Sequence, residues 1–117
     1  MARLSTHVLD TRSGTPAAGM RVVLERLDGG IAVVLRDVRT NGDGRTSEPL
    51  LSGDAIEVGR YRLSFSAADY FRQAGVDLPD PPFFDVVTID FGLADAQGHY
   101  HVPLLVSPWA YSTYRGS

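Results

Sequence analysis

Cysteine is absent from all 117 residues of the sequence. Its absence excludes disulfide bonds, zinc sites built on thiolates and cysteine nucleophiles. Basic residues are also few: 11 Lys and Arg stand against 14 Asp and Glu, and the net charge of −3 argues against electrostatic capture of nucleic acid. No apolar run approaches membrane-spanning length, and residues 1–7 leave no room for the apolar core of a signal peptide. We therefore expect a soluble, cytoplasmic protein with no nucleic-acid or membrane partner.

Length and composition are those of one ordinary globular domain. The hydrophobic fraction of 44% and the charged fraction of 21% are typical of globular proteins. A chain of this length can bury one core without disulfides or metal ions to hold it together. We expect a single domain over residues 1–117.

Short segments of alternating apolar and polar residues fill most of the chain and indicate β-strands. They cover residues 4–10, 21–27, 31–39, 45–51, 61–66, 83–91, 99–106 and 111–117. Turns rich in glycine, proline, asparagine and aspartate separate them. One helix is expected over residues 67–74, with Ser66 as its N-cap and Gly75 as its stop. This pattern predicts an antiparallel β-sandwich.

The alternation also predicts which residues pack between the two sheets, because the side chains of a strand point alternately to its two faces. The expected core comprises Val8, Val22, Leu24, Val34, Leu63, Phe65, Val87, Ile89, Val102 and Leu104. The strand over residues 99–106 has an unusual second face. Opposite its apolar face it carries His99, His101, Pro103 and Leu105. Two histidines and a proline are an uncommon choice for a surface that meets only water.

Side chains able to move protons lie on faces that the alternation turns away from the core. His7 lies on the outer face of the first strand, His101 on that of the penultimate strand, and Arg45 follows a glycine-rich turn. Two imidazoles can share general-base and general-acid work. A guanidinium can bind a substrate carbonyl and the negative charge that develops on it. The pattern favours acid–base chemistry without a metal ion or a covalent intermediate.

Each of these residues alone has a simpler interpretation. A single histidine outside the core, His99 included, is most often a solvated residue, and an exposed arginine contributes little. A metal site needs a third ligand, and the alternation supplies no obvious carboxylate on the same face. A serine nucleophile at Ser112 or Ser117 would lack the Gly-x-Ser-x-Gly turn that exposes such a residue.

Motifs along essentially the whole chain resemble the 5-hydroxyisourate hydrolases, the transthyretin-related family of purine breakdown. Residues 4–11 (LSTHVLDT) with residues 14–17 (GTPA) resemble the opening motif of that family, and residues 40–46 (TNGDGRT) resemble its second motif. Residues 68–71 (ADYF) and 82–85 (PFFD) match its helix and the strand that follows. Residues 99–117 resemble its C-terminal signature, whose final Tyr-Arg-Gly-Ser separates the family from the transthyretin hormone carriers.

The resemblance implies a transthyretin-like sandwich of two four-stranded sheets with one short helix, assembled as a homotetramer. The active sites would lie at the dimer–dimer interface, on the sheet that holds the first strand, the C-terminal hairpin and the short strand after Arg45. The family's catalytic and substrate-binding residues correspond to His7, Arg45, His101 and Ser117. Tyr114 would lie at the mouth of the site and contact substrate. No cofactor and no metal ion are implied.

The implied reaction is the hydrolysis of 5-hydroxyisourate, a small-molecule substrate, to 2-oxo-4-hydroxy-4-carboxy-5-ureidoimidazoline in urate breakdown. A water activated by the histidine pair would attack a ring carbonyl, while Arg45 orients the substrate and Ser117 hydrogen-bonds water or substrate. The alternative is a transthyretin-like carrier of a small ligand, which needs no proton relay. A third interpretation is a plain interaction module, which a monomer with separately solvated histidines would favour.

Overall fold

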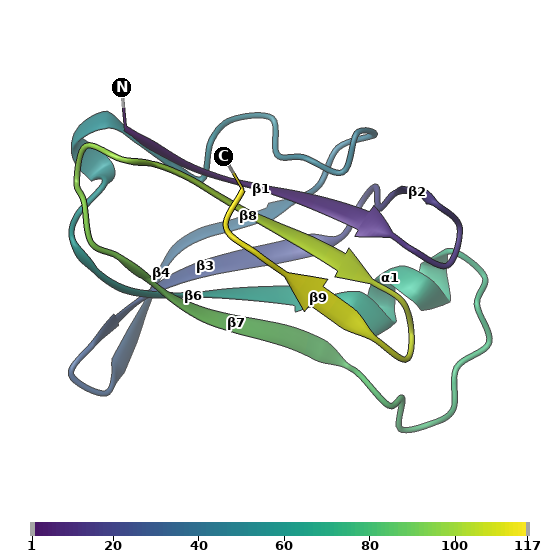
Figure 1. Cartoon of the computed structure of the whole chain (residues 1–117). Coiled ribbons are helices and arrows are strands. Elements are labelled where there is room, and N and C mark those ends of the chain that lie inside the picture. Colours follow the sequence, from purple (N-terminus) through teal and green to yellow (C-terminus); the bar gives the residue numbers. More distant parts are fainter. Residues whose placement is uncertain (1, 117) are drawn as a thin grey trace.

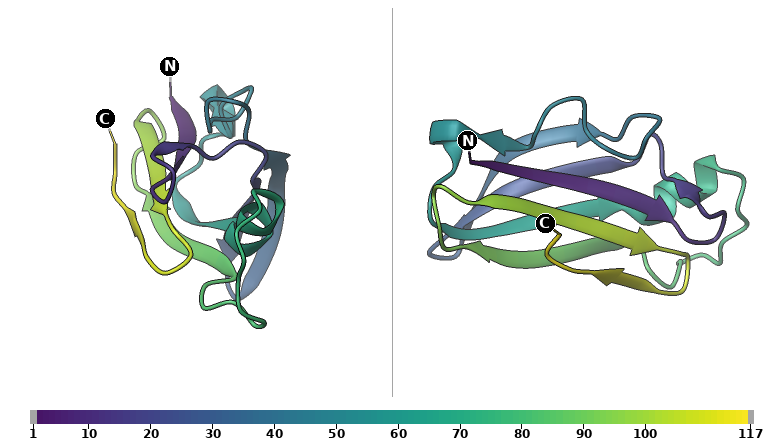
Figure 2. Two further views of the ribbon diagram at one scale, coloured as in Figure 1. Left: turned by 90° about the vertical axis from the view of Figure 1, so that its right-hand side faces the viewer. Right: turned by 45° about the horizontal axis from the view of Figure 1, so that its top comes forward.

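The computed structural model describes residues 2–116, which form two sheets packed face to face with one short helix at one end (Figure 1). The strands are β1 (Arg3–Asp10), β2 (Thr15–Pro16), β3 (Arg21–Asp28), β4 (Ile31–Arg39), β5 (Leu51–Ser52), β6 (Gly59–Ser66), β7 (Val86–Leu93), β8 (His99–Val106) and β9 (Tyr111–Thr113). The helix α1 is Ala67–Gln73, and a short 3₁₀ helix covers Gly53–Ala55. The end-on view in Figure 2 shows the two layers facing each other. The expected sandwich with one short helix is confirmed.

The first sheet places the two ends of the chain side by side. Its strand order is β2-β1-β8-β9, and β5 pairs with the start of β1. Strands β8 and β9 form the expected C-terminal hairpin, closed where the N–H of Ser107 donates to the carbonyl of Ala110 at 2.8 Å. A short strand after Arg45 joins this sheet, as the family resemblance implies, but it is β5 (Leu51–Ser52) and not the expected strand over residues 45–51. Both β2 and β5 are only two residues long.

Strands β1 and β8 run parallel, whereas every other strand pair within residues 2–116 is antiparallel. Their register places Ser5 beside His101 and His7 beside Pro103. A parallel pair needs a long connection, and here the whole second sheet and α1 lie between the two strands in sequence. This pairing sets the geometry of the outer face that carries both histidines.

The second sheet has the order β4-β3-β6-β7 and is antiparallel throughout. Its outer face carries two two-point ion pairs between neighbouring strands. Arg21 donates to Asp37 at 2.9 and 2.7 Å, and Arg62 donates to Asp90 at 2.7 and 3.0 Å. Because these four side chains are exposed, the pairs add little to stability and mark a solvated face.

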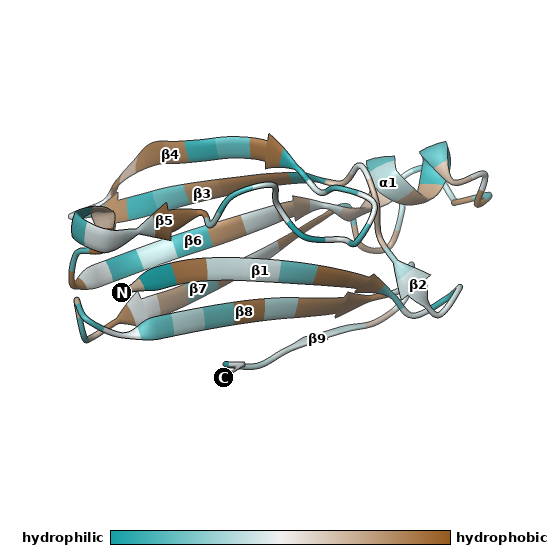
Figure 3. Cartoon of the chain, turned by 90° about the horizontal axis from the view of Figure 1, so that it is seen from above, coloured by the Kyte–Doolittle hydropathy of each residue, from teal (hydrophilic) through white to brown (hydrophobic). Residues whose placement is uncertain are grey.

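The core lies between the sheets and follows the predicted alternation with one error. Val34 is not a core residue, since 57% of it is exposed. The pairing of β3 with β4 shifts register between Leu24 and Glu25, and such a bulge re-aims the side chains that follow it. Leu35 packs against the core instead, and Figure 3 shows that the first half of β4 is apolar. The predicted core residue Ile89 is partly buried against the same cluster.

Two other boundaries test the sequence-based expectations. The helix ends just before Gly75, as the sequence predicts. Gly75 has a φ of +84°, and its N–H donates to the carbonyl of Arg72 at 3.0 Å. The N–H of Val76 donates to the carbonyl of Phe71 at 2.9 Å, which completes a Schellman motif. Strand β7 begins at residue 86 rather than 83. No helix within residues 2–116 is long and apolar enough to span a membrane.

Candidate active site

Three of the expected catalytic residues lie near one another on the outer face of the first sheet. His7 lies on β1 and His101 on β8, two strands that run side by side (Figure 1). Arg45 joins them through an isolated antiparallel bridge with His7. Both histidines are half-buried, whereas Arg45 is exposed. The fold therefore brings together three residues that lie far apart in the sequence.

A tight turn before Arg45 aims this residue at β1. The side-chain oxygen of Asn41 accepts the backbone N–H groups of Asp43 at 2.9 Å and of Arg45 at 3.2 Å. Gly44 has a φ of +74°, and its carbonyl accepts the N–H of Val8 at 2.8 Å. A Cβ at Gly44 would overlap the carbonyl oxygen of Val8. Only glycine therefore allows the turn to lie this close to the strand.

His7 is tied to the same turn. Its Nε2 lies 2.9 Å from the carbonyl oxygen of Asp43. A carbonyl oxygen only accepts hydrogen bonds, so Nε2 carries the proton and donates it. In the neutral ring the lone pair then lies on Nδ1. The contact gives His7 a defined tautomer with Nδ1 as its basic atom.

The ring of His101 is held between β1 and the C-terminal tail. The hydroxyl oxygen of Ser5 lies 2.9 Å from Nδ1 of His101. On the tail side, the N–H of Gly116 donates to the carbonyl of His101 at 2.7 Å. A Cβ at Gly116 would stand 2.7 Å from Cδ2 of the ring, too close for an alanine without movement. Among residues 2–116, no hydrogen bond occupies Nε2 of His101.

The pKa of His101 is lowered from its ordinary value. Burial is the largest cause, because it disfavours the charged ring, and the positive charges of Arg45, His7 and Arg3 follow. A hydrogen bond with the backbone of Ser5 acts in the opposite direction. A lowered pKa keeps His101 neutral near pH 7, which is the form that accepts a proton.

A polar cavity of about 230 Å³ opens beside His101. It is lined by Arg3, Ser5, Arg45, His99, Tyr100 and His101. A second hollow of about 190 Å³ shares Arg3, Ser5 and Arg45 and continues along residues 46–49. Two guanidinium groups in one polar cavity suit an anionic or carbonyl-rich ligand.

The side chains around this cavity can exchange protons and bind an anionic oxygen. Imidazoles supply the first ability and guanidinium groups the second. Within the part of the chain that the structure describes, no group of three or more His, Asp or Glu side chains is placed to hold a metal ion. Sequence reasoning missed Arg3 and Ser5. The signal for Ser5 was present, since it lies two residues before His7 and the alternation places both on one face.

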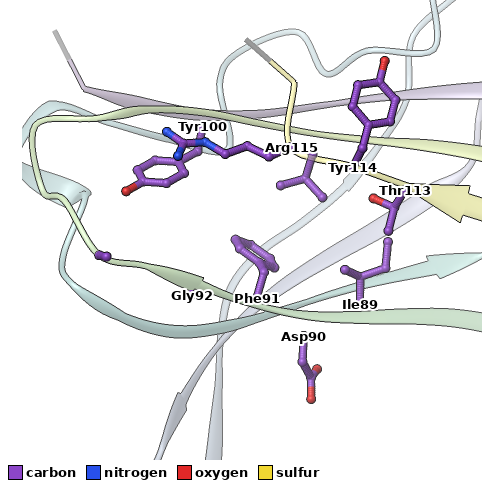
Figure 4. Close-up of a pocket in the computed structure, with 10 residues that line it drawn as sticks. Ile89, Asp90, Phe91, Gly92, Tyr100, Thr113, Tyr114 and Arg115 are labelled. Atoms are coloured by element: carbon purple, nitrogen blue, oxygen red, sulfur yellow. The ribbon is translucent and has the colours of Figure 1, made fainter.

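Of the residues expected in the site, only Arg45 and His101 line this cavity, and His7 lies beside it on β1, bridged to Arg45. Ser117 lies outside the described residues. Tyr114 is 61% exposed and lines a different cavity of about 360 Å³ between β7 and β9 (Figure 4). A role for Tyr114 at the mouth of the site stays a prediction.

Arg115 anchors the tail between the two cavities. Its guanidinium carbon lies 4.3 Å from the ring centroid of Tyr100, which lines both cavities. It also donates to the carbonyl of His99 at 3.2 Å. In Figure 4 the side chain of Arg115 extends toward Tyr100, whereas the ring of Tyr114 points away from Tyr100. These contacts fix the tail along β8 next to the ring of His101.

The sandwich with this strand order and this polar outer face is of the transthyretin type. The chain belongs to the HIUase/Transthyretin family, because the model of that family matches residues 4–116.

Relatives are similar along the entire chain. The 5-hydroxyisourate hydrolase of Ralstonia nicotianae is 57% identical over 117 residues, which cover 100% of both chains. The solved structure of Klebsiella pneumoniae 5-hydroxyisourate hydrolase matches with a TM-score of 0.82 at 38% identity, over 100% of both chains. A structure of (S)-allantoin synthase matches with a TM-score of 0.93 at 44% identity. That match covers 99% of this chain, which spans 44% of the synthase chain.

A ligand-binding protein shares the same fold. Sea bream transthyretin in complex with thyroxine matches with a TM-score of 0.86 at 26% identity, over 98% of this chain and 95% of that chain. One fold therefore supports proteins named as hydrolases and a protein that binds thyroxine. The fold therefore does not distinguish catalysis from ligand binding, and the distinction has to come from the side chains of the site.

Proposed function

We propose that this protein hydrolyses 5-hydroxyisourate to 2-oxo-4-hydroxy-4-carboxy-5-ureidoimidazoline in urate breakdown. The observation that carries the proposal is that Arg45 and His101 line one polar cavity, while His7 lies on the strand beside His101 and is bridged to Arg45. Whole-chain similarity to enzymes named 5-hydroxyisourate hydrolases supports this substrate. The proposal uses no metal ion and no cofactor.

His101 is the general base of this mechanism. Its pKa is lowered by burial and by nearby positive charges, so the ring is neutral when substrate arrives. Because Ser5 covers Nδ1, Nε2 is the nitrogen that receives the proton of a bound water. The water oxygen then attacks a ring carbonyl carbon of the substrate. A positioned general base typically contributes about 10²–10⁴-fold to a rate.

His7 completes the proton relay. Its Nε2 is committed to the carbonyl of Asp43, so Nδ1 is the atom that exchanges a proton. Attack forms a new C–O bond, the ring C–N bond breaks, and the leaving nitrogen takes up a proton from the histidine pair. The net change is addition of one water: its hydroxyl stays on carbon as a carboxylic acid and its hydrogen ends on nitrogen.

Arg45 binds the oxygen that becomes negative during attack. It is held beside His7 by a backbone bridge and lines the cavity together with His101. A fixed donor aimed at a developing oxyanion stabilises the transition state more than the substrate. We assign to Ser117, outside the described residues, a hydrogen bond to water or substrate, and to Tyr114 a contact at the mouth of the site.

We further propose a cytoplasmic homotetramer with its active sites at the dimer–dimer interface. The outer face of the first sheet carries the apolar residues Leu9 and Leu105 in the same strands as the histidines. A second copy of the chain would cover this apolar surface, which is a liability on a monomer. Sedimentation should give about four times the chain mass of 12.7 kDa, and a monomer would contradict the assembly.

The alternative function is that of a small-ligand carrier. The similarity to transthyretin in complex with thyroxine favours it. A carrier has no use for a neutral histidine of lowered pKa beside a second histidine and an arginine. The two functions therefore differ in whether substrate decay depends on His101.

The decay of fresh 5-hydroxyisourate, generated from urate by an oxidase and followed by absorbance, tests the proposal. Wild-type protein should accelerate the decay, and His101→Asn should lose about 10²–10⁴-fold of that effect because it removes the base. Arg60→Gln, at an exposed position of β6 in the other sheet, should keep the wild-type effect. Equal acceleration by His101→Asn would show that the site is wrong. No acceleration by wild type would favour the carrier.

A further inference from the structure

Ser5 is the residue on β1 that touches the ring of His101. The parallel register of β1 and β8 places the two residues directly beside each other. The hydroxyl oxygen of Ser5 lies 2.9 Å from Nδ1 of His101, and both residues are half-buried. Ser5 also lines the polar cavity, so its contact with the ring lies at the edge of the site.

The position of this hydroxyl bears on which ring nitrogen of His101 is basic. In a neutral imidazole one nitrogen carries the proton and the other the lone pair, and the hydrogen bond at one nitrogen sets the state of the other. A hydroxyl can accept from Nδ1–H, which leaves the lone pair on Nε2. A hydrogen bond between the ring and the backbone of Ser5 raises the pKa of His101. It therefore favours the protonated ring, as a hydroxyl that accepts from Nδ1–H does.

The tail removes the freedom of the ring to turn away from Ser5. Gly116 lies so close to Cδ2 of His101 that even a methyl group would not fit without movement. Its N–H also bonds the backbone carbonyl of His101 at 2.7 Å. The imidazole is therefore enclosed by Ser5 at Nδ1 and by Gly116 at the Cδ2 edge.

We propose that Ser5 is a positioning residue: its hydroxyl accepts a hydrogen bond from Nδ1 of His101 and holds the ring in the tautomer whose Nε2 takes a proton from water. The role of that proton in catalysis rests on the hydrolase function proposed above, whereas the tautomer itself does not. A hydroxyl that only packed against the ring would leave both the tautomer and the pH profile unchanged on removal.

Steady-state kinetics of Ser5→Ala and Ser5→Thr test the catalytic part. Ser5→Ala should lower kcat by about 10–100-fold, the usual cost of removing a group that orients a histidine ligand or base, with a smaller change in KM. Loss of an acceptor for the protonated ring lowers the pKa of His101, so the ascending limb of the pH–rate profile should move to lower pH. Ser5→Thr keeps a hydroxyl and should restore most of kcat.

Ser64→Ala is the matched control, because Ser64 is half-buried on β6 of the other sheet. It should keep the wild-type kcat and pH profile, and thermal unfolding should show that Ser5→Ala remains folded. If Ser5→Ala keeps the kcat and pH profile of Ser64→Ala, the positioning role is wrong.

Nitrogen-15 NMR of the imidazole rings tests the tautomer without any substrate, with His101→Asn used to assign the signals. Neutral His101 in wild type should carry its proton on Nδ1, and Ser5→Ala should shift the population toward the Nε2–H form. A wild-type ring protonated on Nε2, or a population that Ser5→Ala leaves unchanged, would overturn the inference. Lack of hydrolysis by wild type would overturn the proposed function instead, and the NMR result would still decide the role of Ser5.

Discussion

The ring of His101 lies against the backbone of Gly116, and the space between them admits no methyl group. A Cβ at Gly116 would stand 2.7 Å from Cδ2 of His101 and 3.3 Å from its Cβ. Gly116 does not adopt a positive φ. The need for glycine here therefore comes from the neighbouring ring and not from the backbone conformation, and the tail packs against the ring of His101 in the candidate site.

Gly116→Ala should accordingly displace either the ring of His101 or the tail that carries residue 116. A misplacement of about 1 Å at a reacting group can cost about 10²-fold in rate, so we expect kcat to fall by about 10–100-fold. The decay assay measures this fall directly. Gly92→Ala is the control, because its Cβ would meet only the carbonyl oxygen of Gly59 at 3.9 Å, an ordinary contact. Full activity in Gly116→Ala would show that the ring tolerates movement.

The charge of Arg45 should be visible in the titration of His101. Burial is the first cause of the lowered pKa of His101, and Arg45 is the second. Arg45→Gln removes that positive charge, so the pKa of His101 should rise toward its ordinary value. The neutral, basic form would then appear only at higher pH, and the ascending limb of the pH–rate profile should move up, while kcat falls from loss of the oxyanion partner.

Proton NMR titration of the His101 ring measures this shift in the folded protein. Arg60→Gln, at an exposed position of β6 in the other sheet, removes one positive charge elsewhere and serves as the control. An unchanged His101 titration in Arg45→Gln would mean that solvent screens the charge completely.

Strand alternation was sufficient to predict which face of β8 meets the core. Tyr100, Val102, Leu104 and Val106 are all buried, as the period of two requires. The same rule places His7 and His101 away from the core, so the candidate site followed from local patterns together with the family resemblance. Pro103 is also buried, although it shares the outer face with His101, and the hydroxyl of Thr113 on β9 donates to its carbonyl at 2.7 Å.

Features that depend on distant pairing were beyond the sequence patterns. Nothing local to residues 3–10 indicates that β1 lies parallel to β8, and that register is what brings Ser5 to His101. The bulge that moves Val34 out of the core arises from the pairing of two strands and not from either strand alone. A serine at a half-buried strand position looks like a solvated residue until its neighbour is known.

The turn that presents Arg45 depends on the side chain of Asn41. Its oxygen accepts two backbone N–H groups, those of Asp43 and Arg45. Asn41→Ala should lower the free energy of unfolding by about 1 kcal/mol, since each such bond contributes about 0.5–1.5 kcal/mol. It should also lower kcat, because Arg45 loses its fixed direction.

Asn41→Asp keeps an acceptor oxygen at the same place and should stay closer to wild type in both measurements. Chemical unfolding gives the first quantity and the decay assay the second. Wild-type kcat in Asn41→Ala would show that the backbone bridge between His7 and Arg45 suffices to hold the guanidinium.

A second buried network ties the end of β1 to α1. Asp10 is completely buried, and its carboxylate accepts the backbone N–H groups of Arg12 at 2.9 Å and Ser13 at 3.2 Å. The phenol of Tyr70, on α1, donates to the same carboxylate at 2.9 Å. Burial, the hydrogen bond to Asp10 and the charge of Asp10 raise the pKa of Tyr70 to about 12.

Tyr70→Phe should therefore lower the free energy of unfolding by about 2 kcal/mol near neutral pH, the scale of a hydrogen bond to a charged group. A raised pKa in the folded state means that this stabilisation is complete below the ordinary tyrosine pKa near 10 and is lost as pH rises toward 12. The gap between wild type and Tyr70→Phe in chemical unfolding should thus narrow from pH 10 to 12. A difference in unfolding free energy that stays constant over this range would mean that folding does not raise the pKa of Tyr70. The bond to Asp10 would then lose its assigned role in docking α1.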